Sequence, residues 1–366
     1  MREYLLTAFV VAAVTYLLTP LVRRFAEMVG AYTAVRDRDV HTIPTPRLGG
    51  VAMFAGISTG LLVASRLPTL QRVFDTSEVR GVLFGGLLLV AIGAADDRWG
   101  LDALTKLAGQ ILAAGVMVLQ GVQLLYLPLP GNTLSLAPNI GVPLTVLFVV
   151  VTINAVNFID GLDGLAAGVV AIAAMAFFAY SYELSVVKHF DRASPPTLIT
   201  IVLAGACLGF LPHNFNPARV FMGDSGSMLL GLMLSAATVS LMGRLDPNAT
   251  ATYGYFPALL PLLLPVAVLA VPFVDLLLAV VRRTRSGQAP WEPDKLHLHH
   301  RLLRLGHSHA RAVLIMYLWS ALIAGGAVTI AFAHNRPLLV LSGYLGAGAI
   351  LLIASNLPRL RSQPRV

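Results

Sequence analysis

The chain has 366 residues, of which 57% are hydrophobic and only 12% are charged, about half the charged fraction of an ordinary soluble domain. This composition excludes a water-soluble protein built around one core, and the single cysteine, Cys207, excludes an internal disulfide and a cysteine metal site. The net charge of +8 indicates an anionic partner. Because the basic residues are scattered between apolar runs, that partner is expected to be a lipid head group or a phosphate substrate, not nucleic acid.

Apolar runs long enough to cross a bilayer, which takes about 20 residues, follow one another along nearly the whole chain. We predict an all-α polytopic membrane protein, with one transmembrane domain over residues 1–366 and about eleven spanning helices. The first run has no small-residue cleavage site, so it is expected to be a retained helix and not a signal peptide. The predicted runs are 4–22, 48–65, 81–95, 107–126, 142–159, 165–182, 197–212, 226–243, 256–281, 312–333 and 337–357.

The distribution of Lys and Arg predicts that the N-terminus lies outside and the C-terminus lies in the cytoplasm. With this orientation, 18 of the 26 basic residues face the cytoplasm. The acidic and histidine-rich segments fall on the same side, although only Lys and Arg were used to orient the chain. We therefore expect one active site beneath the membrane, formed by the loops 23–47, 96–106, 157–164, 213–225 and 282–311.

Two polar groups follow the third and fifth runs. Asp96 and Asp97 stand at a span end, where carboxylates need a partner or water. They suit Mg²⁺ capture or acid–base chemistry, and a solvated helix end is the alternative. In NAVNFIDGLDG, residues 154–164, polar residues recur every three positions beside two glycines, which indicates a divalent-cation or phosphate site, or else a capping turn.

Two further motifs lie near the eighth and ninth runs. In FMGDSG, residues 221–226, Asp224 is expected to hold a metal, or else Asp224 or Ser225 caps the following helix, whose free N–H groups attract phosphate. HLHH, residues 297–300, lies in a basic segment without cysteines. Donors to phosphate or sugar hydroxyls are therefore favoured there over a zinc site, and an exposed polar loop is the alternative.

These four motifs occur in the order found in the polyprenyl-phosphate N-acetylhexosamine-1-phosphate transferase superfamily, which the chain resembles. HTIPTPRLGG, residues 41–50, is similar to the first cytoplasmic loop of that superfamily. The histidine block, interrupted by Leu298, looks like the WecA-type branch, which uses UDP-N-acetylglucosamine. DDRWGLDALTKLAGQ and HLHHRLLRLGHSH look most like actinobacterial members.

The resemblance implies a role for each matching residue. The implied metal ligands are Asn157 and Asp224, which would hold Mg²⁺, with Mn²⁺ as a substitute. The implied catalytic residues are Asp96, Asp97, Asp160 and Lys106. The implied substrate-binding residues are His41, Asp163, Phe221, His297, His299, His300 and Arg301. Among these, Asp163 and Phe221 would recognise uracil. The histidines of HLHH and Arg301 would contact the donor sugar and phosphate.

The implied reaction moves N-acetylglucosamine-1-phosphate from UDP-GlcNAc to decaprenyl or undecaprenyl phosphate and releases UMP, as the first membrane step of cell-envelope polysaccharide synthesis at the plasma membrane. A homodimer is left open. A phospho-N-acetylmuramoyl-pentapeptide transferase is one alternative, and a transporter is another, although ionisable residues gathered at one membrane face favour an enzyme. Direct attack by the lipid phosphate is favoured over a covalent intermediate, because a phosphomonoester with a second pKa of about 6 is already mostly a dianion.

Overall fold

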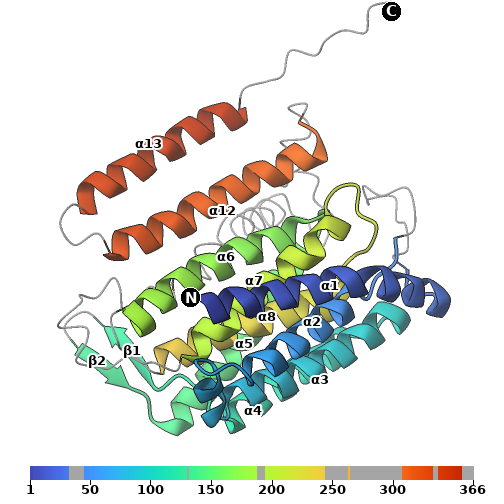
Figure 1. Ribbon diagram of the computed structural model, residues 1–366, viewed down its shortest axis with the longest axis horizontal. Coiled ribbons are helices and arrows are strands. Elements are labelled where there is room, and N and C mark those ends of the chain that lie inside the picture. Colours follow the sequence, from blue (N-terminus) through green and yellow to red (C-terminus); the bar gives the residue numbers. More distant parts are fainter. Residues whose placement is uncertain are drawn as a thin grey trace, which may run out of the picture.

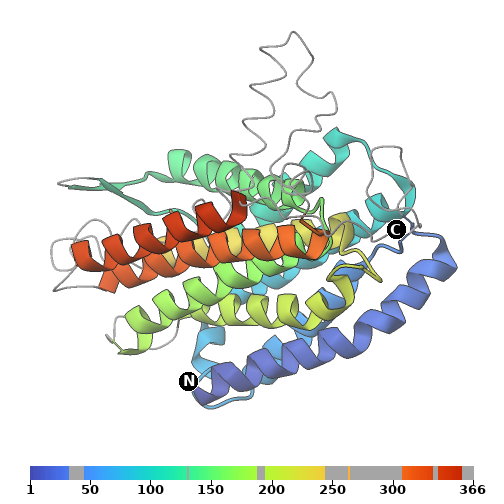
Figure 2. The same ribbon diagram turned by 90° about the horizontal axis from the view of Figure 1, so that it is seen from above.

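The computed structural model describes residues 1–32, 45–129, 132–187, 194–243, 307–332 and 337–356, together with Leu263. They form a bundle of long helices with a short hairpin at one end (Figures 1 and 2). The first half contributes α1 (Arg2–Val29), α2 (Gly49–Ala64), a 3₁₀ turn (Gln71–Asp75), α3 (Glu78–Trp99), α4 (Ala103–Leu119) and α5 (Pro138–Ile159). The second half contributes α6 (Leu165–Tyr182), a π-helical turn (Glu183–Val187), α7 (Pro195–Asn214), α8 (Gly223–Met242), α12 (His309–Phe332) and α13 (Pro337–Asn356).

Every predicted apolar run outside 256–281 coincides with a helix, and 256–281 lies outside the described residues. Within the described ranges, seven helices are long and apolar enough to cross a membrane, while α2, α4 and residues 340–353 of α13 form shorter apolar helices. The chain is therefore an all-α polytopic membrane protein, as its composition predicts. The count of eleven spans and their orientation stay predictions.

The fourth predicted run, 107–126, extends too far. The helix ends at Leu119, and Gly121 takes a left-handed conformation with a φ of 90°. The chain then forms β1 (Tyr126–Leu129), which pairs antiparallel with β2 (Asn132–Ser135). A glycine adopts such a φ without steric cost, so the helix stops although the residues beyond it are still apolar.

The third predicted run, 81–95, is too short. The helix continues through Asp96 and Asp97 and ends only at Trp99. Gly100, which follows it, has a φ of 71° and donates a hydrogen bond from its N–H to the Asp96 carbonyl at 2.8 Å. Asn157 likewise lies in the last turn of α5, and Asp224 lies in the first turn of α8. These polar residues, predicted to lie in loops, therefore stand on helix ends, which hold side chains more firmly than a loop would.

Helix α8 is the central element of the bundle. It packs against α2, α3, α5 and α7, and every residue in it except Asp224 is buried. Small residues allow this close packing, because a Cβ added to Gly231 would lie only 2.5 Å from the Cα of Ile153 in α5. The one partly exposed position of the central helix is thus its acidic residue.

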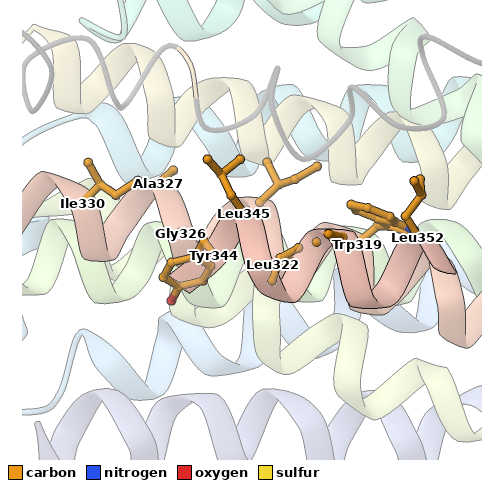
Figure 3. Close-up of a pocket in the computed structure, with 11 residues that line it drawn as sticks. Trp319, Leu322, Gly326, Ala327, Ile330, Tyr344, Leu345 and Leu352 are labelled. Carbon is orange, nitrogen blue, oxygen red and sulfur yellow. The ribbon is translucent and has the colours of Figure 1, made fainter. Parts of the chain in front are cut away.

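Helices α12 and α13 lie side by side along one side of the bundle (Figures 1 and 2). They leave a groove of about 520 Å³ between them, lined by apolar and aromatic side chains that include Trp319, Leu322, Tyr344 and Leu345 (Figure 3). No polar residue predicted to belong to the active site lines this groove. The polar site therefore lies elsewhere in the bundle, at the helix ends.

Candidate active site

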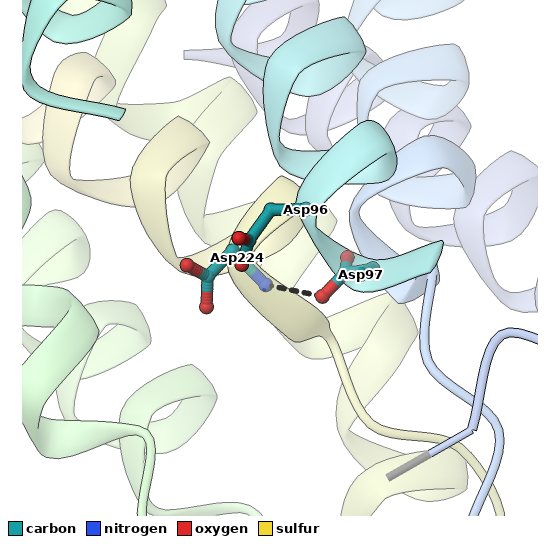
Figure 4. A group of neighbouring side chains, drawn as sticks. All are labelled: Asp96, Asp97 and Asp224. Atoms are coloured by element: carbon teal, nitrogen blue, oxygen red, sulfur yellow. Dashed lines mark hydrogen bonds between the residues drawn. The ribbon is translucent and has the colours of Figure 1, made fainter. Parts of the chain in front are cut away.

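The carboxylate of Asp97 caps the N-terminus of α8. Its Oδ1 accepts a hydrogen bond from the Asp224 N–H at 2.9 Å (Figure 4). Its Oδ2 accepts bonds from the Ser225 N–H at 3.2 Å and from Ser225 Oγ at 2.8 Å. The first N–H groups of a helix have no partner within it, and negative charge is favoured there. The alternative in which Asp224 or Ser225 caps α8 is therefore wrong, because Met222 holds the cap position and the capping carboxylate comes from α3.

Two glycines allow α3 and α8 to approach closely enough for this contact. Gly223 has a φ of 69°, and a Cβ added to it would lie 2.2 Å from Asp97 Oδ2. A Cβ on Gly93 of α3 would lie 2.4 Å from the Ser225 backbone. From the sequence, free N–H groups at this helix end were expected to attract a substrate phosphate. The N–H groups of Asp224 and Ser225 are not available for that, because both donate to Asp97.

Lys106 links the other two carboxylates of the cluster. Its Nζ lies 3.3 Å from Asp96 Oδ2 and 3.1 Å from Asp224 Oδ2. Asp96 Oδ1 also accepts a hydrogen bond from the Leu101 N–H at 2.7 Å. Carboxylate oxygens of Asp96, Asp97 and Asp224 all lie within 4.8 Å of one another. The cluster thus concentrates negative charge, and one ammonium group bridges two of its three members.

The amide of Asn157 completes this cluster from α5. Its Nδ2 donates hydrogen bonds to Asp224 Oδ1 at 3.1 Å and to Ser227 Oγ at 2.8 Å. One turn earlier, Asn154 Nδ2 donates to Gln110 Oε1 at 2.7 Å. The polar stripe predicted from the spacing in 154–164 is therefore confirmed for Asn154 and Asn157, which face α4 and α8.

Asp160 follows α5 directly and lies partly buried near the cluster. Burial, together with the negative charge of Asp224, raises the pKa of its carboxyl to about 7, while the Arg47 guanidinium acts in the opposite direction. A carboxyl group with such a pKa exchanges its proton near neutral pH. Asp160 can therefore take up or release a proton beside the carboxylate cluster.

Asp163 is buried and holds two connecting segments together. Its Oδ2 accepts hydrogen bonds from Asn216 Nδ2 and from the Ala218 N–H, both at 2.9 Å. These bonds attach the turn after α5 to the segment between α7 and α8. The structure thus assigns Asp163 a structural contact, and its predicted contact with uracil stays a prediction.

Gly164, next to Asp163, connects three helices. Its N–H donates to Asn214 Oδ1 at 3.1 Å, and its carbonyl accepts a hydrogen bond from the Tyr317 hydroxyl. The Tyr317 ring also packs on Gly168, where an added Cβ would lie 2.0 Å from it. Sequence reasoning missed Asn214 and Tyr317, because neither belongs to a recognisable motif.

The first predicted loop also reaches the site. The N–H of Phe221 donates to the Pro46 carbonyl at 2.8 Å, and its carbonyl accepts from the Gly49 N–H at 3.1 Å. Residues 45–50 therefore lie against the segment before α8. The predicted substrate-binding residues His41, His297, His299, His300 and Arg301 lie outside the described residues.

The residues of the cluster fit a hard divalent cation such as Mg²⁺. Such ions take carboxylate and amide oxygens as ligands. Asp96 and Asp224 bring carboxylate oxygens together from two helices, and the Asn157 amide of α5 lies against Asp224. Lys106 already compensates two of the carboxylates with positive charge. Asp97 is less suited as a ligand, because its oxygens already accept three hydrogen bonds from α8.

Comparisons with known proteins find one matching family and several similar proteins. Glycosyl transferase family 4 matches residues 79–242, the segment from α3 to α8 that holds the cluster. The "Decaprenyl-phosphate N-acetylglucosaminephosphotransferase" of Mycobacterium tuberculosis is 49% identical, over 99% of this chain and 90% of its own length. The protein of the same name from Mycolicibacterium smegmatis is 49% identical, over 100% and 90%. A "Probable undecaprenyl-phosphate N-acetylglucosaminyl 1-phosphate transferase" of Bacillus subtilis is 33% identical, over 86% and 81%.

Proposed function

Since this chain belongs to glycosyl transferase family 4, among its polyprenyl-phosphate N-acetylglucosamine-1-phosphate transferases, we propose that it transfers N-acetylglucosamine-1-phosphate from UDP-GlcNAc to decaprenyl phosphate and releases UMP. The two relatives at 49% identity are named for decaprenyl phosphate, and the one at 33% is named for undecaprenyl phosphate. This difference in identity supports the longer acceptor.

One observation carries the proposal: carboxylates from α3 and α8, with the Lys106 ammonium of α4 between them, meet at one end of a bundle of apolar helices. A polyprenyl phosphate keeps its head group at the membrane surface, and a nucleotide sugar stays in water. A site at the helix ends is where both can be reached. A transporter would instead need its ionisable residues near the middle of the membrane.

We propose that Asn157, Asp224 and Asp96 hold Mg²⁺, or Mn²⁺ in its place. The bound ion would supply positive charge to the diphosphate of the donor. Lys106 is placed to contact the same diphosphate, because its ammonium already lies 3.1 Å from Asp224 Oδ2. Positive charge fixed at this point stabilises the charge that moves to the leaving UMP.

The hydrogen bonds of the carboxylates support direct attack by the lipid phosphate. A covalent pathway needs a carboxylate with a free oxygen as nucleophile, and the Asp97 oxygens already accept three hydrogen bonds. Asp97 would then act by holding α8 in place. Asp160, whose pKa is raised to about 7 by burial, is suited to accept the proton of the minor protonated acceptor, since the second phosphate pKa is about 6.

We also propose that this end of the bundle faces the cytoplasm. Basic residues support the proposal, since Arg23, Arg47, Arg98, Lys106 and Arg219 belong to the end that holds the carboxylates. Among the described residues, the opposite end of the bundle has fewer basic residues, namely Arg2, Arg66, Arg72 and Arg80. An excess of Lys and Arg marks the cytoplasmic side of membrane proteins.

The test is an assay of the purified protein in detergent with UDP-GlcNAc, decaprenyl phosphate and Mg²⁺, with UMP and the glycolipid measured separately. We expect both products in equal amounts, no product after chelation of divalent ions, and almost none from Asp224→Asn. UDP-N-acetylmuramoyl-pentapeptide in place of UDP-GlcNAc should give no lipid product. Turnover of that donor alone would identify a muramoyl-pentapeptide transferase, and uptake into vesicles without UMP release would identify a transporter.

A further inference from the structure

We propose that Ser227 is a positioning residue that orients the amide of Asn157, so that its carbonyl oxygen, not its NH₂ group, is left to bind the divalent cation. The inference rests on the proposed function, because it concerns the same cation. The Asn157 side chain donates two hydrogen bonds from Nδ2, to Ser227 Oγ at 2.8 Å and to Asp224 Oδ1 at 3.1 Å. The Oδ1 atom takes part in neither of these two hydrogen bonds.

Ser227 selects this orientation because it can only accept a hydrogen bond from Asn157. A serine hydroxyl has one proton, and Ser227 donates it to the Gly223 carbonyl at 3.1 Å. The ionised carboxylate of Asp224 is also only an acceptor. A reversed amide would therefore place its own oxygen against two acceptors and lose both hydrogen bonds.

The position of Ser227 makes the contact specific. It follows Asp224 by three residues on α8, so both side chains lie on the same face of the helix. Ser227 is fully buried, and water cannot replace its hydroxyl if that group is removed. The motif at 221–226 is thus continued by one further residue, which acts on the cation through Asn157 and not by direct contact.

The test measures binding of Mn²⁺ by electron paramagnetic resonance, with the purified protein in detergent and no substrate present. Ser227→Ala should raise the Mn²⁺ dissociation constant about fivefold, the effect of losing one ordinary hydrogen bond. Ser235→Ala is the matched control. Ser235 is also buried in α8 and donates to a backbone carbonyl, that of Leu232 at 2.8 Å. Ser235→Ala removes a comparable hydrogen bond that does not involve Asn157, so it should change the Mn²⁺ dissociation constant by less than about twofold.

A double variant separates orientation from a general effect on the helix. In an Asn157→Ala background, Ser227→Ala should weaken Mn²⁺ binding no further, because the amide that it orients is gone. Ser227→Cys retains a weak acceptor and should give an intermediate constant, which also serves if Ser227→Ala does not fold. An unchanged constant in the Ser227 variants, or a full additional loss in the double variant, would overturn the inference.

The same data distinguish the two proposals. If the unaltered protein binds Mn²⁺ and the Ser227 variants bind it equally well, only the role of Ser227 is refuted. If the unaltered protein binds no Mn²⁺, the cation site and the role of Ser227 are both refuted.

Discussion

Asp97 and Ser225 are joined by two hydrogen bonds, from the Ser225 N–H at 3.2 Å and from its hydroxyl at 2.8 Å to the same carboxylate oxygen. The two residues come from α3 and α8, which are separated by more than a hundred residues of sequence. This contact fixes the start of α8 against the end of α3. The distance between Asp96 and Asp224, and with it the cation site, therefore depends on Asp97.

Asp97→Ala should destabilise the protein by about 3 kcal/mol, because hydrogen bonds to a charged group contribute about 1.5–3 kcal/mol and the donors of Asp224 and Ser225 are left buried. Mn²⁺ binding should weaken as well. The free energy of unfolding in detergent measures the first effect. Asp102→Ala is the control, since Asp102 caps α4 by accepting from the Leu104 and Thr105 N–H groups but is exposed. A loss for Asp97→Ala no greater than for this control would contradict the prediction.

Lys106→Met should lower the turnover number about a hundredfold, the usual cost of removing one group that stabilises transition-state charge. Binding of Mn²⁺ should become tighter, not weaker, because the ammonium that competes for Asp96 and Asp224 is gone. Lys106→Arg keeps the charge and should retain more of the activity. Normal turnover together with weaker Mn²⁺ binding in Lys106→Met would rule out the assigned role.

Gly223→Ala and Gly100→Ala form a matched pair. Both glycines have a positive φ, 69° and 71°, but a Cβ at Gly223 would lie 2.2 Å from Asp97 Oδ2, whereas one at Gly100 would meet nothing within 4 Å. Gly100→Ala should cost about 1–2 kcal/mol from the left-handed backbone alone. Gly223→Ala should cost about 2 kcal/mol more through the clash. Chemical denaturation of both variants measures the difference, and equal losses would show that Asp97 can move aside.

Because the pKa of the Asp160 carboxyl is raised, we expect the free energy of unfolding to depend on pH in buffer free of divalent ions. Burial raises its pKa from 3.8 to about 7 in the folded protein, so between these values the folded state holds a proton that the unfolded state has lost. Stability should therefore fall as the pH rises from about 4 to about 7 and remain lower above that. Asp160→Asn cannot ionise, and it should melt a few degrees higher than the unaltered protein at about pH 8.

The difference in melting temperature between Asp160→Asn and the unaltered protein should shrink as the pH falls and vanish below about pH 4, where the Asp160 carboxyl is protonated in the folded and the unfolded protein alike. A difference that stays constant across this range would show that the proton of Asp160 is not its cause. The activity of Asp160→Asn gives a separate readout. Loss of a proton acceptor should lower turnover most between about pH 6 and pH 7, where Asp160 is partly ionised and the acceptor phosphate is partly protonated.

Much of the fold follows from the sequence because burial in a bilayer depends on long local runs of apolar residues. Ten such runs were matched by helices, and the cluster of Asp96, Asn157 and Asp224 was expected from motif order and from their common side of the membrane. The hairpin after α4 and the true end of α3 were not expected, because Gly100 and Gly121 end helices through their backbone conformation and not through a change in hydropathy.

The sequence by itself determined that this protein lies in a membrane, where its helices are and which group of residues would form its site. The tertiary structure alone decided what each of these residues contacts. Asp97 proved to be a helix cap, Asp163 a link between two segments, and Ser227 the acceptor for an amide. Hydropathy is a property of a segment and can be summed along the chain, whereas a hydrogen bond needs two atoms within about 3 Å and in line, a condition that only the packed helices fulfil.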